Sequence, residues 1–314
     1  MRKFNHKEYK VFAQRSQRRN FLSTVLCPFS LVPLIAIIFF IGCTPKPIDI
    51  NIKQADPKLV ISSQIIPNQI MFVSVMRSFS ALSGQANGGS VSTNFLSGIL
   101  VSDAFVTVSY NGKKDTLAMV SPGIYASANT LQYNYGVYNL YVVDPVNSLE
   151  VTAMSTILPK VTVDTIYPKV QKYVTDTVIT VHSEFRDSLN VENYYVISYF
   201  NKTGVGVGVD ISGYFNNGEN QLNTFDIYTD KSFDSTKVTI DKQLNKISAN
   251  DTIAVVISNI SQGYYDFLSA YKRAGELFNQ ISGEPINYPT NIIGGYGYFN
   301  THYPDYRIFY LKNY

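Results

Sequence analysis

Short apolar runs, each bounded by turn-forming residues, recur through the first half of this chain and constrain its fold more than any other feature. In the run from Met71 to Phe79, Met71, Val73 and Val75 fall on one face of an extended chain, because successive side chains of a strand point to opposite faces. The runs follow one another at roughly the 8–12-residue spacing that is typical of a β-sandwich. The sequence therefore predicts a fold built mainly from strands.

The dipeptide Asn111-Gly112 separates two of these runs and predicts a tight hairpin, because both residues tolerate positive φ. With this pair, the first half contains seven strand candidates, which are residues 59–62, 71–79, 104–110, 116–120, 123–126, 136–143 and 149–156. Seven short strands over about a hundred residues suit an immunoglobulin-like β-sandwich, which we place at residues 58–165.

Residues 166–314 are predicted to form a second β-sandwich-type domain with one packed helix, after a boundary near Pro159–Pro168. Its strand candidates are residues 173–185, 193–200, 204–209, 223–228, 237–240, 252–257 and 307–311. The helix is predicted at residues 261–280, where apolar residues recur at helical spacing; they are Phe267, Tyr271, Ala274 and Phe278. Ser261 can cap the start of this helix, and Gly283 lies just past its end.

The N-terminal region has the pattern of an export signal. The first twenty residues hold seven basic residues and one acidic residue, and residues 21–43 then carry no charge. A basic region, an apolar region and a small residue at the cut make up a signal peptide. The residue after the cut is Cys43, preceded by Gly42, as in a bacterial lipobox. We therefore predict a signal peptide at residues 1–42, a lipid anchor on Cys43 that holds the protein on a membrane, and a tether at residues 43–57.

Two alternatives concern this N-terminal region. The apolar segment could stay as an uncleaved anchor, because about 20 apolar residues can span a bilayer as a helix; Pro28 and Pro33 interrupt it and favour cleavage. Arg18-Arg19 resembles a twin-arginine export motif, whereas the very apolar segment that follows favours the general export route. Under each alternative the globular part lies outside the inner membrane.

The formal charge of +3 belongs to the signal peptide, because the chain without residues 1–42 has 19 basic and 22 acidic residues, a charge of −3. Because the excess of basic residues is removed with the signal peptide, the basic pI gives no support for nucleic-acid binding. Cys27 lies in the signal and Cys43 would be acylated. No disulfide and no thiolate metal site is therefore expected, and the fold depends on burial of its core.

The histidines that remain, His182 and His302, have no second histidine or cysteine at metal-ligand spacing. We expect each to be an ordinary surface or strand-face residue, and we predict no metal and no cofactor. The sequence contains no Gly-x-Ser-x-Gly motif and no serine with a recognisable base, so nucleophilic hydrolysis lacks a signature.

Two further motifs resemble ligand-binding loops. Residues 204–209, GVGVGV, have alternate glycines but precede β-type sequence rather than a helix, so a bent or bulged strand is favoured over a phosphate site. Asp226, Asp230 and Asp234 are spaced four apart. A solvated acidic face is favoured over a calcium site, because the spacing matches no known calcium loop.

The most distinctive segment is residues 285–300, PINYPTNIIGGYGYFN. Its glycines allow positive φ or close approach of the backbone, and Tyr296, Tyr298 and Phe299 lie among them. These three aromatic side chains could form a binding rim for a sugar or a partner. The favoured interpretation is a closing turn whose aromatic side chains fill the core over the helix, because aromatic residues near glycine turns more often pack than bind.

Several of these segments together resemble the domain of unknown function 4249 family. The likeness spans most of the chain after Cys43 and includes the lipobox cysteine, KLVI at 58–61, VSDAFVTV at 101–108, GIY at 123–125, NYY at 193–195, YYDFL at 264–268 and PTNIIGGYGYF at 289–299. The last of these is the most specific. Two departures from the family pattern are Ser62-Ser63, where a glycine is common, and the long loop at 83–93. The resemblance implies a lipoprotein of the Bacteroidota outer membrane that works near TonB-dependent receptors, and it carries over no catalytic residue.

The sequence therefore leads us to expect a non-enzymatic lipoprotein of the outer membrane, which binds or assists a partner such as an uptake receptor. A surface structural or adhesive module is the second hypothesis, based on the Tyr- and Asn-rich strands. A hydrolase that uses carboxylates such as Asp226 and Asp230 is the third, because glycosidases need only two acids at a short separation.

Overall fold

A computed structural model of the chain describes residues 56–79, 98–173, 177–188, 191–201, 223–233, 236–245, 247–277 and 288–314. These ranges all belong to one compact unit, Gln54–Tyr314. Cys43, residues 204–209 and Asp234, which the sequence analysis singled out, lie outside the described residues.

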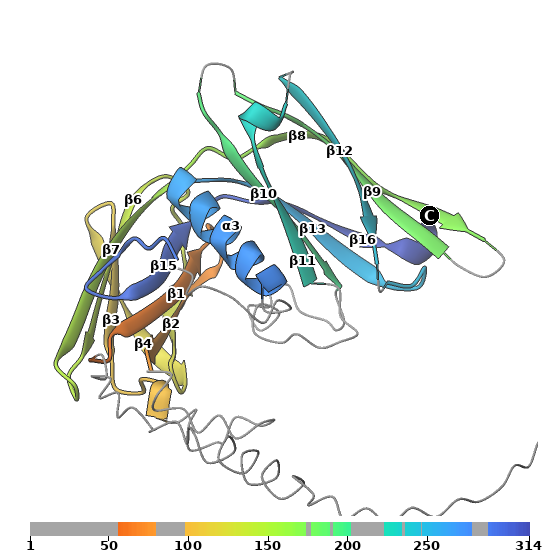
Figure 1. The fold of residues 1–314 in the computed structure, drawn as a ribbon. Helices are drawn as coiled ribbons and strands as arrows, with labels where there is room; N and C mark the ends of the chain where they lie inside the picture. Colours follow the sequence, from red (N-terminus) through yellow and green to blue (C-terminus); the bar gives the residue numbers. More distant parts are fainter. Residues whose placement is uncertain are drawn as a thin grey trace, which may run out of the picture. The chain divides into compact units, whose positions relative to one another are not determined.

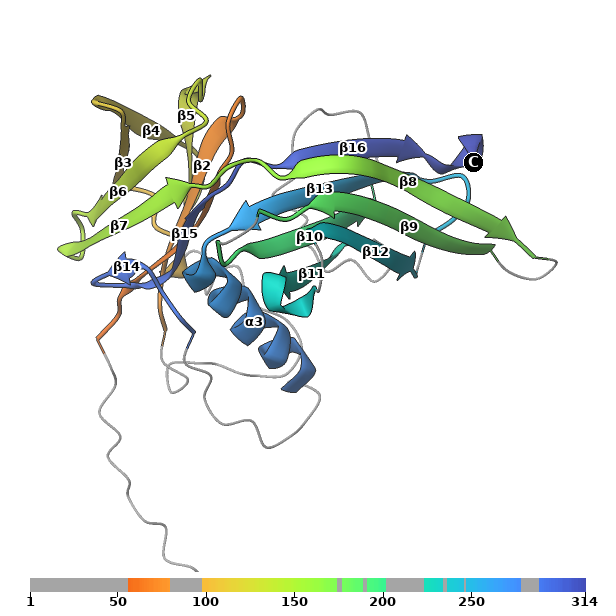
Figure 2. The ribbon, with the colours of Figure 1, turned by 90° about the horizontal axis from the view of Figure 1, so that it is seen from above.

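Nine strands form one long sheet in the order β14-β7-β6-β3-β4-β5-β2-β1-β15 (Figures 1 and 2). The strands are β1 (Leu59–Ile65), β2 (Ile70–Arg77), β3 (Phe105–Tyr110), β4 (Lys113–Ser121), β5 (Ile124–Thr130), β6 (Gly136–Asp144), β7 (Leu149–Ile157), β14 (Ile292–Ile293) and β15 (Tyr296–Thr301). Although β14 and β15 are consecutive in the chain, they occupy the two opposite ends of this order. The sheet therefore curls back on itself, and we call the result the first sandwich.

The alternation of the sequence explains how the first sandwich is filled. In β1, Leu59, Ile61 and Ile65 are fully buried, and Met71, Val73 and Val75 of β2 face the same core. The hairpin predicted at Asn111-Gly112 is confirmed, since both residues have positive φ and β3 pairs with β4 up to Tyr110 and Lys113. All seven strands expected in this half of the sequence are present.

Two smaller sheets enclose a second core and form the second sandwich. One has the order β11-β10-β13-β16 and the other the order β12-β9-β8. Alternate side chains of β9, β10 and β13 point into this core, where Phe185, Tyr199 and Val255 are fully buried. The strands of the two sheets are β8 (Thr162–Lys172), β9 (Thr177–Arg186), β10 (Tyr194–Asn201), β11 (Asn223–Thr229), β12 (Lys237–Leu244), β13 (Thr252–Ile260) and β16 (Asp305–Tyr310).

The helix α3 (Gln262–Leu277) lies on the outer face of the sheet that contains β10 and β11 (Figure 2). The predicted cap is confirmed, because the Tyr264 backbone N–H donates to Ser261 Oγ over 3.3 Å. Two short 3₁₀ helices, η3 (Asp230–Ser232) and η4 (Leu311–Asn313), follow β11 and β16.

The face of α3 that packs against the sheet differs from the predicted one. Tyr264 and Leu268 are buried against the sheet, whereas Tyr271 is half exposed. The side chain of Ala274 and the whole of Phe278, which completed the predicted stripe, lie outside the described part of the chain. The buried face of the helix therefore begins at Tyr264, one turn earlier than the sequence suggested.

The predicted mainly β architecture with one helix near the C-terminus is confirmed. One prediction is wrong: the segment 285–300 was expected to be a closing turn, whereas its residues 292–293 form β14 and residues 296–301 form β15, both strands of the first sandwich. The segment contains three glycines, which have low strand propensity, and its partners lie more than 130 positions earlier in the chain. Among the described residues, no helix has the length and apolar character needed to cross a membrane.

Candidate functional site

The glycine-rich segment closes the first sandwich. Strand β15 pairs in parallel with β1, with Gly297 opposite Ile61, while β14 pairs with β7. The Asn291 side chain fixes the bend between them: its Oδ1 accepts from the Phe299 N–H at 2.9 Å, and its Nδ2 donates to the Phe299 carbonyl at 2.7 Å and to the Met154 carbonyl at 3.0 Å. One amide side chain thus links the two edges of the sheet.

The three aromatic residues predicted in this segment have different environments. Phe299 is fully buried in the core of the first sandwich. Tyr298 is buried against the helix, with its ring centroid 5.1 Å from that of Tyr264 and 5.4 Å from that of Phe267. Tyr296 is half exposed, and the Lys58 ammonium lies 5.1 Å from its ring centroid. The packing of Tyr298 and Phe299 favours the core interpretation for these two, and only Tyr296 is available at the surface.

His182 lies on the outer face of the three-stranded sheet, as the sequence suggested for a strand-face residue. Its Nδ1 is 2.8 Å from Asp241 Oδ1, its Nε2 is 3.6 Å from Glu184 Oε1, and its ring lies against Tyr167. The hydrogen bond from His182 lowers the pKa of Asp241. Within the described part of the chain, no group of three or more His, Cys, Asp or Glu side chains is placed to hold a metal ion.

The aspartates considered for catalysis are held by basic or backbone partners. Asp226 lies between Lys242 and Lys272, at 2.6 and 3.2 Å. Asp230 accepts from the backbone N–H groups of Asn193 and Lys231, at 3.3 and 2.8 Å. These contacts are those of residues that stabilise a fold.

A shallow open depression lies at one end of the second sandwich and is lined by Asp164, Arg186, Asp187, Thr236 and Lys237. Its two basic side chains are paired with carboxylates. Arg186 Nε donates to both carboxylate oxygens of Asp164, at 3.0 and 3.2 Å, and Lys237 Nζ lies 3.0 Å from Glu184. Exposed pairs of this kind contribute little energy, and among the described residues both basic side chains of this lining are already paired with carboxylates.

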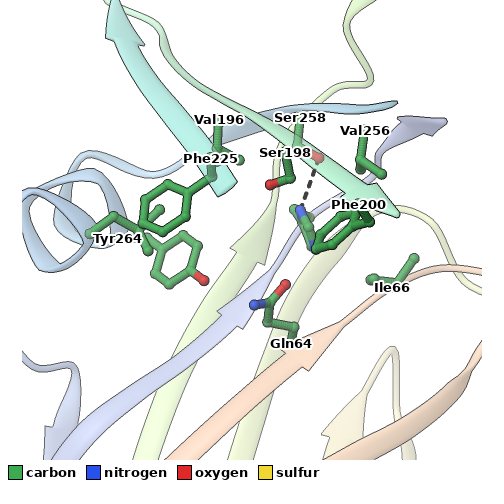
Figure 3. Close-up of a pocket in the computed structure, with 11 residues that line it drawn as sticks. Gln64, Ile66, Val196, Ser198, Phe200, Phe225, Val256, Ser258 and Tyr264 are labelled. Atoms are coloured by element: carbon green, nitrogen blue, oxygen red, sulfur yellow. Dashed lines mark hydrogen bonds between the residues drawn. The ribbon is translucent and has the colours of Figure 1, made fainter. Parts of the chain in front are cut away.

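A more enclosed cavity lies where β1 meets the outer face of the sheet of β10 and β13 (Figure 3). Its polar lining comes from Gln64, Ser198, Ser258 and His302, and Figure 3 shows the first three around one space. Apolar side chains form the remaining wall; they are Ile66, Val196, Phe200, Phe225, Val256, Tyr264 and Leu268. The centre of a water molecule can occupy about 20 Å³ of this space, which is room for about one water.

His302 is the central polar residue of this cavity. It is almost fully buried, its Nδ1 is 3.0 Å from Ser258 Oγ, and its Nε2 has no hydrogen-bond partner among the described residues. Burial lowers the pKa of His302 to about 4, because a low-dielectric environment disfavours the charged imidazolium. The imidazole is therefore neutral at pH 7. The surface or strand-face position predicted for His302 is therefore wrong, because the side chain is buried.

No sequence signal identifies this cavity. Its polar residues come one at a time from separate strands and from the residue after β15, so no motif or spacing connects them. They meet only because β15 returns to β1.

The buried histidine predicts a measurable loss of stability in acid. Its pKa is about 4 in the folded protein and near 6.5 when exposed, so only the unfolded chain binds the proton between these pH values. The free energy of unfolding should therefore fall by up to about 3 kcal/mol as the pH falls from 7 to 4. Urea denaturation of the wild type and of His302→Gln at several pH values checks this. His182 is present in both proteins and cancels in the difference; equal pH slopes for the two proteins would contradict the prediction.

Comparison with known proteins identifies a protein family. No curated protein sequence matches this chain. Among solved structures, trypsin-activated alpha-2-macroglobulin from Escherichia coli and the chicken interferon gamma receptor alpha chain are each 11% identical to it, with TM-scores of 0.21 and 0.20. The matches cover 68% and 65% of this chain, and 15% and 90% of those two chains, so this chain spans about one seventh of the macroglobulin.

The model of one protein family, the domain of unknown function DUF4249, matches residues 45–304. This range includes the first sandwich, most of the second, the helix and the glycine-rich segment that closes the first sandwich. The resemblance noted from the sequence is thereby confirmed at the level of the family, and this chain belongs to the DUF4249 family.

Proposed function

We propose that this protein is a lipid-anchored lipoprotein of the outer membrane that acts by binding a partner protein, an uptake receptor of the TonB-dependent class. It is a binding or accessory component rather than an enzyme. The observation that carries the proposal is the order of segments at the N-terminus: a basic region, an uncharged apolar region and Gly42-Cys43 directly precede the family match, which begins at residue 45.

The chemistry of the described side chains supports a binding role. The histidine on the sheet surface, His182, is engaged by Asp241, and Asp226 is engaged by two lysines. A nucleophile needs an adjacent base, and a glycosidase needs two free carboxyl groups that face each other. Side chains bound in this way stabilise strands, which suits a protein that acts through contacts of its surface with a partner.

The anchor is tested by changing Cys43 to serine. Serine cannot form the thioether to a diacylglycerol, so the Cys43→Ser protein should lose its lipid and move out of the membrane fraction. Mass spectrometry of the wild type should find a mature N-terminus at Cys43 with acyl chains attached. Cys27→Ser, in the part of the chain that would be removed, is the matched control and should leave both results unchanged. An unmodified N-terminus, or a Cys43→Ser protein that is cleaved and still sediments with the envelope, would overturn the proposal.

The partner is tested by co-purification from outer membranes solubilised in mild detergent. A receptor-sized outer-membrane protein should be recovered in stoichiometric amount with the tagged wild type, and recovery of the lipoprotein alone would count against a receptor role. Proteolysis of intact cells tests the alternative of a surface adhesin, because an adhesin has to be cleaved from outside. Protection from protease in intact cells would exclude that alternative.

A further inference from the structure

We propose that one end of the first sandwich docks on the lipid bilayer. We call it the tether end, because the chain that leads back to Cys43 leaves the sandwich there, at Asp56–Lys58. The inference rests on the proposed lipid anchor, and it adds a defined orientation of the protein on the membrane. Its residues are Lys58, Phe105, Val120, Val146, Ile293 and Tyr296.

Hydrogen bonds place several turns and strand ends together at the tether end (Figure 1). The Ser78 N–H donates to the Lys58 carbonyl over 2.7 Å, which joins the end of β2 to the start of β1. Arg77 Nε donates to Asp144 Oδ2 over 2.8 Å, which adds the turn between β6 and β7. The Val75 N–H donates to the Gly123 carbonyl over 2.8 Å, which adds the turn between β4 and β5.

The start of β3 and the strand β14 lie at the same end. Phe105 pairs with Val143, one residue before the end of β6 and the turn that holds Val146. A side chain at Gly294 would lie 2.9 Å from the carbonyl oxygen of Glu150, near the beginning of β7, so Ile293 is adjacent to this turn. Five separate segments therefore meet around the point at which the chain enters the sandwich.

Each of these segments exposes an apolar or aromatic side chain. The exposed fractions are 73% for Ile293, 68% for Val146, 61% for Val120, 48% for Tyr296 and 47% for Phe105. A single exposed apolar residue is ordinary. Apolar residues contributed by several turns at one end of a domain form a surface that is suited to burial against something apolar.

The charges at the tether end are mixed and therefore do not select an anionic partner. Lys58 lies over the Tyr296 ring, and Arg77 is bound to Asp144. Asp103 and Glu150 are exposed nearby and carry the opposite charge. Tyrosine, a lysine stem and aliphatic side chains are the residues that insert at the boundary between lipid headgroups and acyl chains. We therefore expect docking by apolar insertion, with little dependence on salt.

The length of the chain favours the bilayer as the occupant over a soluble partner. Thirteen positions separate Cys43 from Asp56, and a fully extended chain of that length spans at most about 45 Å. A protein anchored at Cys43 therefore keeps the tether end within this distance of the lipid at all times. Such tethering makes a weak surface contact effectively intramolecular.

The test uses the full lipidated protein in vesicles of phosphatidylethanolamine and phosphatidylglycerol. Because Cys43 would be acylated and Cys27 removed, one introduced cysteine can carry a single nitroxide label. We choose Val146→Cys and Ile293→Cys at the tether end, and Lys113→Cys, an exposed position beside the hairpin at the opposite end of β3, as the matched control. Collision rates with oxygen, which partitions into lipid, and with a water-soluble nickel chelate are compared for each label.

Docking predicts that the two labels at the tether end collide with the nickel chelate several-fold less often than the control label, and with oxygen several-fold more often. Vesicles that pellet with the protein while all labels remain equally accessible to the nickel chelate would overturn the docking and leave the anchor intact. A protein that fails to pellet with vesicles would overturn the anchor as well. Shielding that appears only after solubilised outer-membrane protein is added would assign this end to a protein partner and overturn the inference.

Discussion

Replacing Gly297 with alanine is expected to destabilise the protein by more than about 4 kcal/mol, which exceeds the effect of most single substitutions. A Cβ atom at this position would overlap the carbonyl oxygen of Ile61 on the neighbouring strand. The backbone of Gly297 also has φ of +95°, a conformation that L-residues rarely adopt. Since Ile61 belongs to the rigid core, the strands β1 and β15 would have to separate.

Gly136→Ala is the matched control for this prediction. Gly136 has φ of +90°, close to that of Gly297, but a Cβ built there meets no atom within 4 Å. Its substitution should therefore cost only the backbone strain, roughly 1–2 kcal/mol. Urea denaturation of both variants separates the steric contribution from the conformational one. Equal stabilities of the two variants would show that β15 does not pack on β1 as described.

Replacing Asn193 with aspartate is expected to cost about 3–5 kcal/mol, the magnitude found when a buried charge lacks its partner. The Asn193 amide is almost fully buried. Its Nδ2 donates to Asp187 Oδ1 at 3.1 Å and to the carbonyls of Ser188 and Val191 at 3.3 and 2.9 Å. A carboxylate would face these three oxygens with no proton to donate, and the bend that leads into β10 would open.

The Asp187→Asn change should rescue this variant in part. In the wild type, Asn193 Nδ2 and the Tyr195 hydroxyl both donate to Asp187 Oδ1. An amide nitrogen in the place of that oxygen can donate one hydrogen to the new carboxylate and the other to the Tyr195 hydroxyl oxygen, which then accepts. The coupling of the two substitutions is obtained from a double-mutant cycle of unfolding free energies. Additive effects of Asn193→Asp and Asp187→Asn would contradict the arrangement described for this bend.

The sequence was informative where contacts are local. The alternation of Met71, Val73 and Val75, and the hairpin at Asn111-Gly112, depend on neighbouring residues and predicted β2, β3 and β4 correctly. Ser261 likewise identified the start of α3, because a capping side chain acts within one turn. Such features predicted the mainly β class and the single helix near the C-terminus.

Non-local pairing accounts for what could not be predicted. The segment around Gly297 appeared to be a turn, because its strand character comes from β1 and not from its own residues. The burial of His302 and the cavity around it depend on the same pairing. The prediction that Tyr271 is buried failed for a related reason. Helical spacing alone is compatible with several buried faces, and contact with the sheet under α3 buries Tyr264 and Leu268 instead.

The return of β15 to β1 also determines when the protein can fold. Thr290 follows Ile157, the last residue of the seven consecutive strands, by 133 positions, which corresponds to roughly ten seconds of synthesis. During that interval β1 lacks its partner strand β15, so the amino-terminal strands cannot complete their fold as an independent unit. The first sandwich is completed by β15 and the second by β16, so neither core is complete until the last strands of the chain have been made.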